Sequence, residues 1–292
     1  MSRSSPVLVV GASGRVGRMV CHHWPAGDVP LLRTQRGPGA DVVAWSPLEG
    51  PEPLLRHLSQ SGTRPGALVM LAGVTPGSGV DIAALAANRD LALGCLAAAK
   101  AAGIGRVLLA SSSAVYGVAP DGAPFAETAP PHPLSPYAMA KLQMEAACDP
   151  ARQAGTEVCA LRIGNVAGAD ALLGPLTGLP VDPARPLRID AFADGLGPLR
   201  SYIGGATLAR LLAALARLPG ALPPVLNIAA PTPVRMVDLA RAAGWPHQMV
   251  AAPASAHQTI TLDCALVNRL CPFSPEDNLV QTMVQQWKAS WL

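Results

Sequence analysis

Charged residues are scarce in this sequence, and lysine is almost absent. Of 292 residues, 14% are charged and 50% are hydrophobic, so we expect a sizeable buried core and no extended disorder. The net charge is +3, the arginines are scattered, and only 4% of the residues are aromatic. The sequence has no basic stripe with interleaved aromatics, so we expect no nucleic-acid partner. This length fits one large domain, or one domain with a small lobe.

Signals for metal binding and export are also missing. The six cysteines form no CxxC pair and show no zinc spacing, so we interpret them as small buried side chains in a reducing compartment. His22 and His23 are adjacent and would point in different directions on a helix, so we expect no metal site. The apolar run Val7–Val10 is too short for a signal peptide. No apolar run reaches transmembrane length without a charge or a helix breaker. We predict a cytoplasmic protein with no membrane partner.

The first apolar run leads into a glycine-rich loop, Gly11-Ala-Ser-Gly-Arg-Val-Gly17, and then into a helical stretch to about residue 24. Strand, glycine turn and helix together are the context of a dinucleotide site; a plain glycine turn is the alternative. Gly11 permits a tight turn, Gly14 lets the backbone approach a pyrophosphate, and Gly17 lets the helix pack on the strand. Backbone N–H groups at the helix start would face the phosphates. The predicted contacts are Gly11, Ser13, Gly14, Arg15, Val16 and Gly17.

The second predicted strand, residues 29–32, is not followed by an acid. A carboxylate at that point would bind the adenosine ribose of NAD. Here Arg33 and Arg36 follow, and Arg15 lies in the glycine loop. Because arginine suits the 2′-phosphate of NADP, we favour NADP over NAD as the cofactor. The alternative is that these arginines are solvated loop charges.

Apolar and helical segments continue to alternate over the first half of the chain. We expect strands at residues 41–45, 67–72, 106–110 and 157–163, with helices at 53–60, 81–102 and 136–154. This alternation predicts an α/β fold, a doubly wound parallel sheet of the Rossmann type, in which ligands lie at the carboxyl ends of the strands. Further cofactor-binding candidates near those ends are Ser46, Leu71, Ala72, Gly73 and the mid-helix Asn88.

The alternation breaks after residue 163. Residues 174–199 are dense in proline and glycine, and a helix around 208–215 precedes a strand at 225–228. A helix at 236–243, a strand at 259–262 and a closing helix at 281–291 complete the chain. We therefore predict a dinucleotide-binding domain of residues 1–165 plus about 205–230. Residues 166–204 and 231–292 would form a smaller C-terminal substrate lobe.

Tyr137 and Lys141 lie four residues apart in a helix that Ser135 can cap and Pro136 can begin. This spacing places both side chains on one face. An ammonium beside a phenol favours the phenolate and lowers its pKa, so Tyr137 would exchange a proton near neutral pH. Ordinary surface spacing is the alternative, although only two other lysines occur in the chain.

With these residues in place, the sequence resembles the extended short-chain dehydrogenase/reductases, specifically the NAD-dependent epimerase/dehydratase family, over nearly its whole length. Besides the glycine loop, the matching segments are Ser111-Ser-Ser-Ala-Val-Tyr-Gly117, Ser135-Pro-Tyr-Ala-Met-Ala-Lys141 and Leu161-Arg-Ile-Gly-Asn-Val-Ala-Gly168. The resemblance implies that Ser112, with Ser113 as the fallback, hydrogen-bonds the substrate oxygen. It implies that Tyr137 transfers the proton and that Lys141 holds the nicotinamide ribose. It also implies that Asn165 and Val166 line the junction of cofactor and substrate.

The segment Arg200-Ser-Tyr-Ile203 resembles the family's Arg-Asp-Tyr-Ile, whose arginine grips the diphosphate of sugar nucleotides. Arg200 is the corresponding candidate, and a surface arginine is the alternative. Where the family's dehydratases carry Thr-Asp-Glu, this chain has Ser112-Ser-Ala, so we do not expect dehydration. The span from Asn165 to Arg200 is short for a full sugar-nucleotide pocket.

Three interpretations follow from these residues. The first is an epimerase of a sugar nucleotide or sugar-like substrate, and the second is an NADP-dependent reductase of a small carbonyl compound. The third is a dinucleotide-sensing regulatory protein, for which we would expect the set of Ser112, Tyr137 and Lys141 to be eroded, whereas it is complete. By resemblance, the helices at 81–102 and 136–154 would pair across a homodimer.

Overall fold

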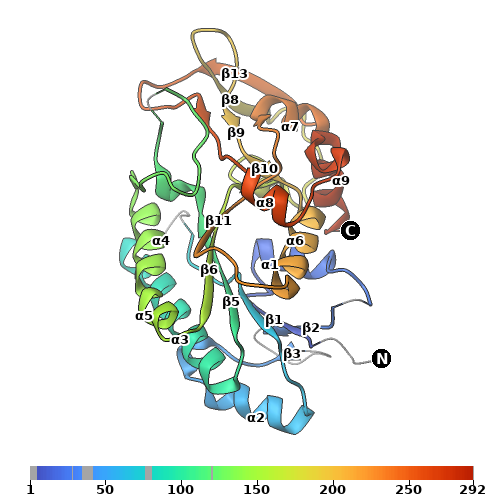
Figure 1. Ribbon diagram of the computed structural model, residues 1–292. Coiled ribbons are helices and arrows are strands. Elements are labelled where there is room, and N and C mark those ends of the chain that lie inside the picture. The colour runs from blue at the N-terminus through green and yellow to red at the C-terminus, as the bar shows by residue number, and fades with distance from the viewer. Residues whose placement is uncertain (1–4, 28, 35–41, 76–80, 120, 292) are drawn as a thin grey trace.

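The computed structural model describes residues 5–27, 29–34, 42–75, 81–119 and 121–291. Its centre is a seven-stranded sheet in the order β11-β6-β5-β4-β1-β2-β3, with every neighbouring pair parallel (Figure 1). The doubly wound α/β fold predicted from the sequence is confirmed. The strands are β1 (Val7–Val10), β2 (Leu31–Thr34), β3 (Val42–Val43), β4 (Ala67–Met70), β5 (Arg106–Ser112), β6 (Glu157–Ile163) and β11 (Val225–Ile228).

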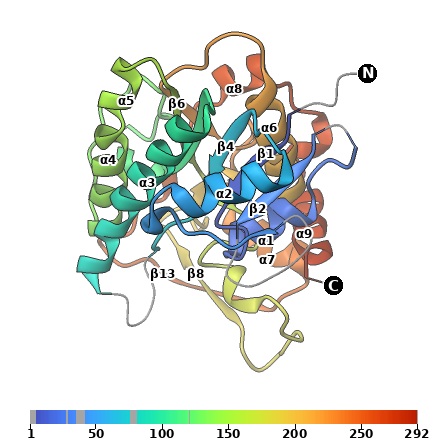
Figure 2. The same ribbon diagram turned by 90° about the horizontal axis from the view of Figure 1, so that it is seen from below.

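Helices cover both faces of this sheet (Figures 1 and 2). Successive side chains of a strand point to opposite faces, so the wholly apolar β1 contributes to two cores. Val7 and Val9 pack in one hydrophobic cluster with residues of α1 and α6, whereas Leu8 and Val10 pack in a second with α2, α3 and α4. The helices are α1 (Arg15–His22), α2 (Glu52–Ser61), α3 (Ala87–Ala102), α4 (Pro136–Ala147) and α6 (Gly205–Arg217).

The predicted bounds of β6, β11 and α7 (Met236–Ala243) are confirmed, whereas other predicted bounds differ from the structure, three of them as follows. Strand β2 lies two residues later than expected. The helix expected at 81–102 begins as the 3-10 turn η2 (Ile82–Ala86). The helix expected at 136–154 ends at Ala147, and α5 (Asp149–Gln153) follows it. Pro150 explains this break, because proline has no backbone N–H to donate within a continuing helix.

A smaller lobe lies beyond the carboxyl ends of the sheet strands (Figure 1). One hydrophobic cluster runs from the α1 and α6 face into this lobe and includes Ile189, Leu239 and Met283. The two parts therefore share a core; the domain limits given above stay a prediction. Besides α7, the lobe holds β7 (Asn165–Val166), β8 (Leu187–Ala191), β9 (Leu199–Arg200), β10 (Tyr202–Ile203), β12 (Val234–Arg235), β13 (His247–Ala251), β14 (Thr259–Ile260), α8 (Ala265–Leu270) and α9 (Val280–Ala289).

One helical stretch, residues 82–102, is long and apolar enough to cross a membrane by length and composition alone. It carries Arg89 and Asp90, and its buried residues Cys95 and Ala99 pack in the core against the sheet. A buried core helix passes the same test. The expected absence of a membrane partner stays a prediction.

Candidate active site

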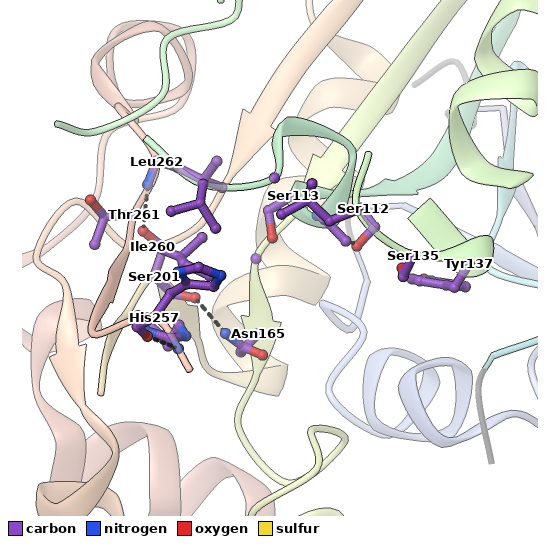
Figure 3. Close-up of a pocket in the computed structure, with 16 residues that line it drawn as sticks. Ser112, Ser113, Ser135, Tyr137, Asn165, Ser201, His257, Ile260, Thr261 and Leu262 are labelled. Atoms are coloured by element: carbon purple, nitrogen blue, oxygen red, sulfur yellow. Dashed lines mark hydrogen bonds between the residues drawn. The ribbon is translucent and has the colours of Figure 1, made fainter. Parts of the chain in front are cut away.

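Two cavities meet at the carboxyl ends of β5 and β6. One, of about 240 Å³, is lined by Val16, Leu71, Gly73, Lys141 and Val166 among others. The other, of about 450 Å³, extends toward the smaller lobe. Figure 3 shows Ser112, Ser135 and Tyr137 on one side of this second cavity and His257, Ile260 and Leu262 on the other. Four residues line both cavities: Ser112, Tyr137, Gly164 and Asn165.

The three serines at the carboxyl end of β5 lie in different places. Ser112 ends the strand, lines both cavities, and its hydroxyl accepts a hydrogen bond from the backbone N–H of Ala114 at 3.2 Å. Ser113 lines only the larger cavity. The buried Ser111 donates to the Glu145 carboxylate. Of the three, Ser112 is therefore the one at the junction; its hydrogen bond to a substrate oxygen stays a prediction.

Lys141 is almost completely buried, with 4% of its surface exposed. Its ammonium donates to the carbonyl of Ala110 at 2.9 Å and lies 5.9 Å from the centre of the Tyr137 ring. Burial lowers the pKa of Lys141 to about 8, and the nearby Glu145 opposes this shift. The ammonium is thus held at the wall of the smaller cavity, beside Gly73.

The predicted direction of the Tyr137 pKa was wrong. Burial raises the pKa of Tyr137 above its ordinary value, and a hydrogen bond with Ser112 only partly opposes this. At 5.9 Å from the ring centre, the Lys141 ammonium does not reverse the effect of burial. In this state Tyr137 is a protonated phenol, which is the form required of a proton donor.

Lys141→Met is expected to stabilise the protein while removing its activity. Because the pKa of Lys141 is lower in the folded state, burial of its charge opposes folding below about pH 8. Removing that charge should raise the free energy of unfolding at pH 7 by about 3 kcal/mol. For the wild type this cost fades between about pH 8 and pH 10.5 as the folded state releases the proton. Denaturant unfolding of both proteins at pH 7 and at the upper end of that range measures the difference; an equal gap at both pH values would contradict it.

The glycine loop fits a dinucleotide. Gly11 has φ +91°, and a Cβ at Gly17 would lie 2.1 Å from the Gly11 carbonyl oxygen, so turn and packing require these glycines. Gly14 differs, because an added Cβ would meet only the Gly11 oxygen, at 3.4 Å. The space beside the Gly14 backbone is therefore not filled by other residues of the protein, and a ligand can approach the backbone there. Arg15 and Val16 follow at the start of α1, where the helix leaves backbone N–H groups without i−4 partners.

Two of the three arginines proposed for the 2′-phosphate lie in the described part of the chain. Arg33 lies within β2, in register with Val9 on the α1 face of the sheet. Its charge acts to lower the pKa of the Cys21 thiol in α1, against the larger effect of burial. A guanidinium nitrogen of Arg15 approaches Gly174. Arg36 lies outside the described residues. The residue that ends β2 is Thr34, whose hydroxyl accepts from the N–H of Gly11 at 3.4 Å. Sequence reasoning missed Thr34 because it ended the strand two residues early.

Two other cofactor candidates, Asn88 and Ser46, hydrogen-bond to the protein backbone and do not line the smaller cavity. Asn88 is fully buried; its side chain accepts from the N–H of Val74 and donates to the carbonyls of Val74 and Leu85. It therefore holds the loop after β4 and does not line the cavity. Ser46 caps the 3-10 turn Pro47–Glu49. Leu71 and Gly73 do line the smaller cavity, and Ala72 lies against Gly11.

Two residues at the site were not foreseen. Asp170 lines the smaller cavity, accepts from the Tyr202 hydroxyl at 2.7 Å, and has its pKa raised by burial. His257 lines the larger cavity together with the predicted Arg200 and Asn165. Proximity to Asn165 was the only sequence signal for Asp170. His257 reaches the site through long-range pairing of β14 with β9, which local pattern does not reveal.

The fold and the junction of these cavities define a dinucleotide-binding enzyme of the short-chain dehydrogenase/reductase type. Residues 7–177 match the NAD dependent epimerase/dehydratase family, and the chain belongs to it. No curated protein sequence matches this chain. The family supports an NAD(P) cofactor, and the site residues named above fit one.

Solved structures share the fold across nearly the whole chain. One is TunA, an NAD-dependent NDP-hexosamine 5,6-dehydratase of tunicamycin biosynthesis, with TM-score 0.77, 22% identity, and 99% of this chain and 98% of that one covered. Another is the UDP-glucose 4-epimerase of Thermus thermophilus in complex with NAD, with TM-score 0.71, 20% identity, and 97% and 99% covered. A third is WbmG of Bordetella bronchiseptica with NAD and UDP, with TM-score 0.75, 19% identity, and 99% and 95% covered. At these identities the likeness establishes the fold.

Proposed function

We propose that this protein is an epimerase acting on a sugar nucleotide or a sugar-like substrate. The observation that carries the proposal is that Ser112, Tyr137 and Asn165 form a shared wall between the cofactor cavity and a larger second cavity. Family membership and structural neighbours named as UDP-glucose 4-epimerases support this choice. Among the described residues that line the larger cavity there is no carboxylate, which favours epimerisation over dehydration.

The reaction is the oxidation of a carbinol to a ketone and its reduction on the opposite face. When bound, NAD(P) supplies the hydride acceptor and donor for this chemistry. Ser112 would hydrogen-bond the substrate oxygen. Tyr137, after releasing its own proton to solvent, would take the carbinol proton as a phenolate in the oxidation and return it as a phenol in the reduction. Lys141 would bind the nicotinamide ribose. Asn165 and Val166 would position the two ligands at the junction.

The cofactor is expected to be NADP rather than NAD. Support comes from Arg15 at the start of α1 and from the absence of an acid at the described end of β2, where Thr34 stands. The structural neighbours named with a bound cofactor carry NAD. A reductase that exchanges NADPH at each turnover is the second candidate, and the same Arg15 and Thr34 favour it.

The first experiment is to denature the purified protein and identify the nucleotide that it releases. An epimerase keeps its hydride between two half-reactions, so stoichiometric retained dinucleotide is expected. An empty site that NADP(H) stabilises would favour the reductase. The identity of the nucleotide answers a separate question: NAD(H) would contradict the preference for NADP. Proton NMR of the loaded protein with UDP-glucose then tests for a second epimer directly.

A cytoplasmic homodimer acting on a small molecule completes the proposal. The outward faces of η2, α3 and α4 carry exposed apolar side chains, namely Ile82, Leu93 and Met139. Their exposure supports pairing of these helices with a second copy. A monomeric mass by light scattering at micromolar concentration would remove this part of the proposal.

A further inference from the structure

Most of the N–H donors of the Arg200 side chain already form hydrogen bonds within the protein. One terminal nitrogen donates to the carbonyls of Leu199 at 2.8 Å and Gln258 at 2.7 Å, and the other donates to the carbonyl of His257 at 2.7 Å. Three of the five guanidinium N–H groups are thereby used. The planar, bidentate approach to a diphosphate that makes arginine effective elsewhere is therefore only partly open to this side chain.

The bonds of Arg200 fix the segment that carries His257. The N–H of Leu199 donates to the Gln258 carbonyl at 2.7 Å, and β14 pairs with β9 immediately afterwards. The Gln258 amide donates to the Asp194 carboxylate at 2.8 and 2.9 Å. With its backbone held in this way, His257 places its side chain in the wall of the larger cavity, across from Ser112 and Tyr137 (Figure 3).

The charge of this cavity favours an anion. Its described titratable lining residues are Tyr137, Arg200 and His257, with no carboxylate among them. Within the described part of the chain Arg200 makes no ion pair, and the nearby charge of Asp190 only partly offsets the cost of burying its own. Burial lowers the pKa of Arg200, as expected for a cation without a close partner. An incoming anion would relieve this imbalance.

We propose that His257 is the side chain that binds the anionic group of the substrate, a phosphate if the substrate is a sugar nucleotide, and that Arg200 is mainly its positioning residue. The His257 imidazole has a hydrogen-bond donor that bonds to no backbone group in the described structure. Arg200 contributes its positive charge to the cavity and holds the His257 and Gln258 carbonyls in place. This inference rests on the proposed function for the identity of the anion, but not for the anion site itself.

The test is a double-mutant cycle in which isothermal titration calorimetry measures the dissociation constant of each probe, with the cofactor site saturated. The probes are UDP, uridine, pyrophosphate and malonate. His257→Ala should weaken UDP binding by about 10- to 100-fold, the range for a hydrogen bond to a charged group, and leave uridine unchanged. Arg200→Lys keeps the charge, but one ammonium nitrogen cannot reproduce the two guanidinium nitrogens that hold the three carbonyls. As a single variant it should therefore weaken UDP binding, and it should add little in the His257→Ala background. His132→Ala, an exposed histidine outside both cavities, is the matched control.

The outcomes separate this site from the proposed function. If His257→Ala leaves UDP affinity unchanged while the wild type interconverts UDP-sugars, the His257 site is overturned and the epimerase stands. If UDP fails to bind but pyrophosphate or malonate binds in a His257-dependent way, the anion site stands and the proposal of a sugar-nucleotide substrate is overturned. Additive losses in the double variant would show that Arg200 binds the anion directly. Binding of none of the probes would overturn the site.

Discussion

Tyr137→Phe is expected to lower kcat by about 10²- to 10⁴-fold, the range for a lost general acid–base group. The phenol lies in the shared wall of the two cavities, where it can reach a substrate oxygen, and Ser112 hydrogen-bonds to it. The substitution removes one oxygen and keeps the ring, so packing should be unchanged. Steady-state kinetics with the substrate established by NMR measures the effect, and cofactor affinity should stay within a few-fold of wild type.

Tyr116→Phe is the matched control for this variant. Tyr116 is buried, stacks on Phe125 and donates to Asn227 at 2.8 Å, but lines neither cavity. Its loss should cost about 1 kcal/mol of stability, as for an ordinary hydrogen bond, and leave kcat within a few-fold. Equal losses of activity in both variants would show that the effect of Tyr137→Phe is structural.

Local sequence pattern was enough to single out Tyr137, which the structure places in the wall shared by the two cavities. The spacing of Tyr137 and Lys141 on a capped helix depends only on neighbouring residues, and so does the turn at Gly11. Strands such as β1 and β4 were recognisable because they are wholly apolar, as buried parallel strands often are. The end of β2 was misplaced because proline and polar residues surround it, so its pattern is weak.

What the sequence could not provide depends on contacts between distant segments. Arg200 was expected to face the substrate, yet its donors meet carbonyls of residues 257 and 258, which fold back beside β9. The Tyr137 pKa was misjudged for a related reason. The helical spacing predicts that the Lys141 ammonium lies near Tyr137. It does not predict how deeply Tyr137 is buried, and that burial, which raises its pKa, depends on the whole fold.

Glu145→Ala is expected to cost about 3–5 kcal/mol of folding free energy, because it leaves a buried charge unpaired. Glu145 lies one turn after Lys141 on α4 and pairs with Arg162 of β6, with nitrogen–oxygen distances of 2.7 and 3.1 Å. Both side chains are 6% exposed. Without the carboxylate, the Arg162 guanidinium would remain buried against the Tyr116 ring, 4.6 Å from its centre. Denaturant unfolding at pH 7 measures the loss.

Asp238→Ala provides the comparison, since it breaks the exposed Arg241–Asp238 pair, whose side chains are 64% and 47% exposed. That change should cost at most about 1 kcal/mol. Replacing Glu145 and Arg162 together by methionine should recover much of the stability lost in Glu145→Ala, since no charge is then left unpaired. Activity should not recover with it, because Glu145 also accepts from Ser111, next to Ser112, and supports the charge of Lys141. A double variant that regains both stability and kcat would show that this ion pair serves folding alone and does not position the catalytic residues.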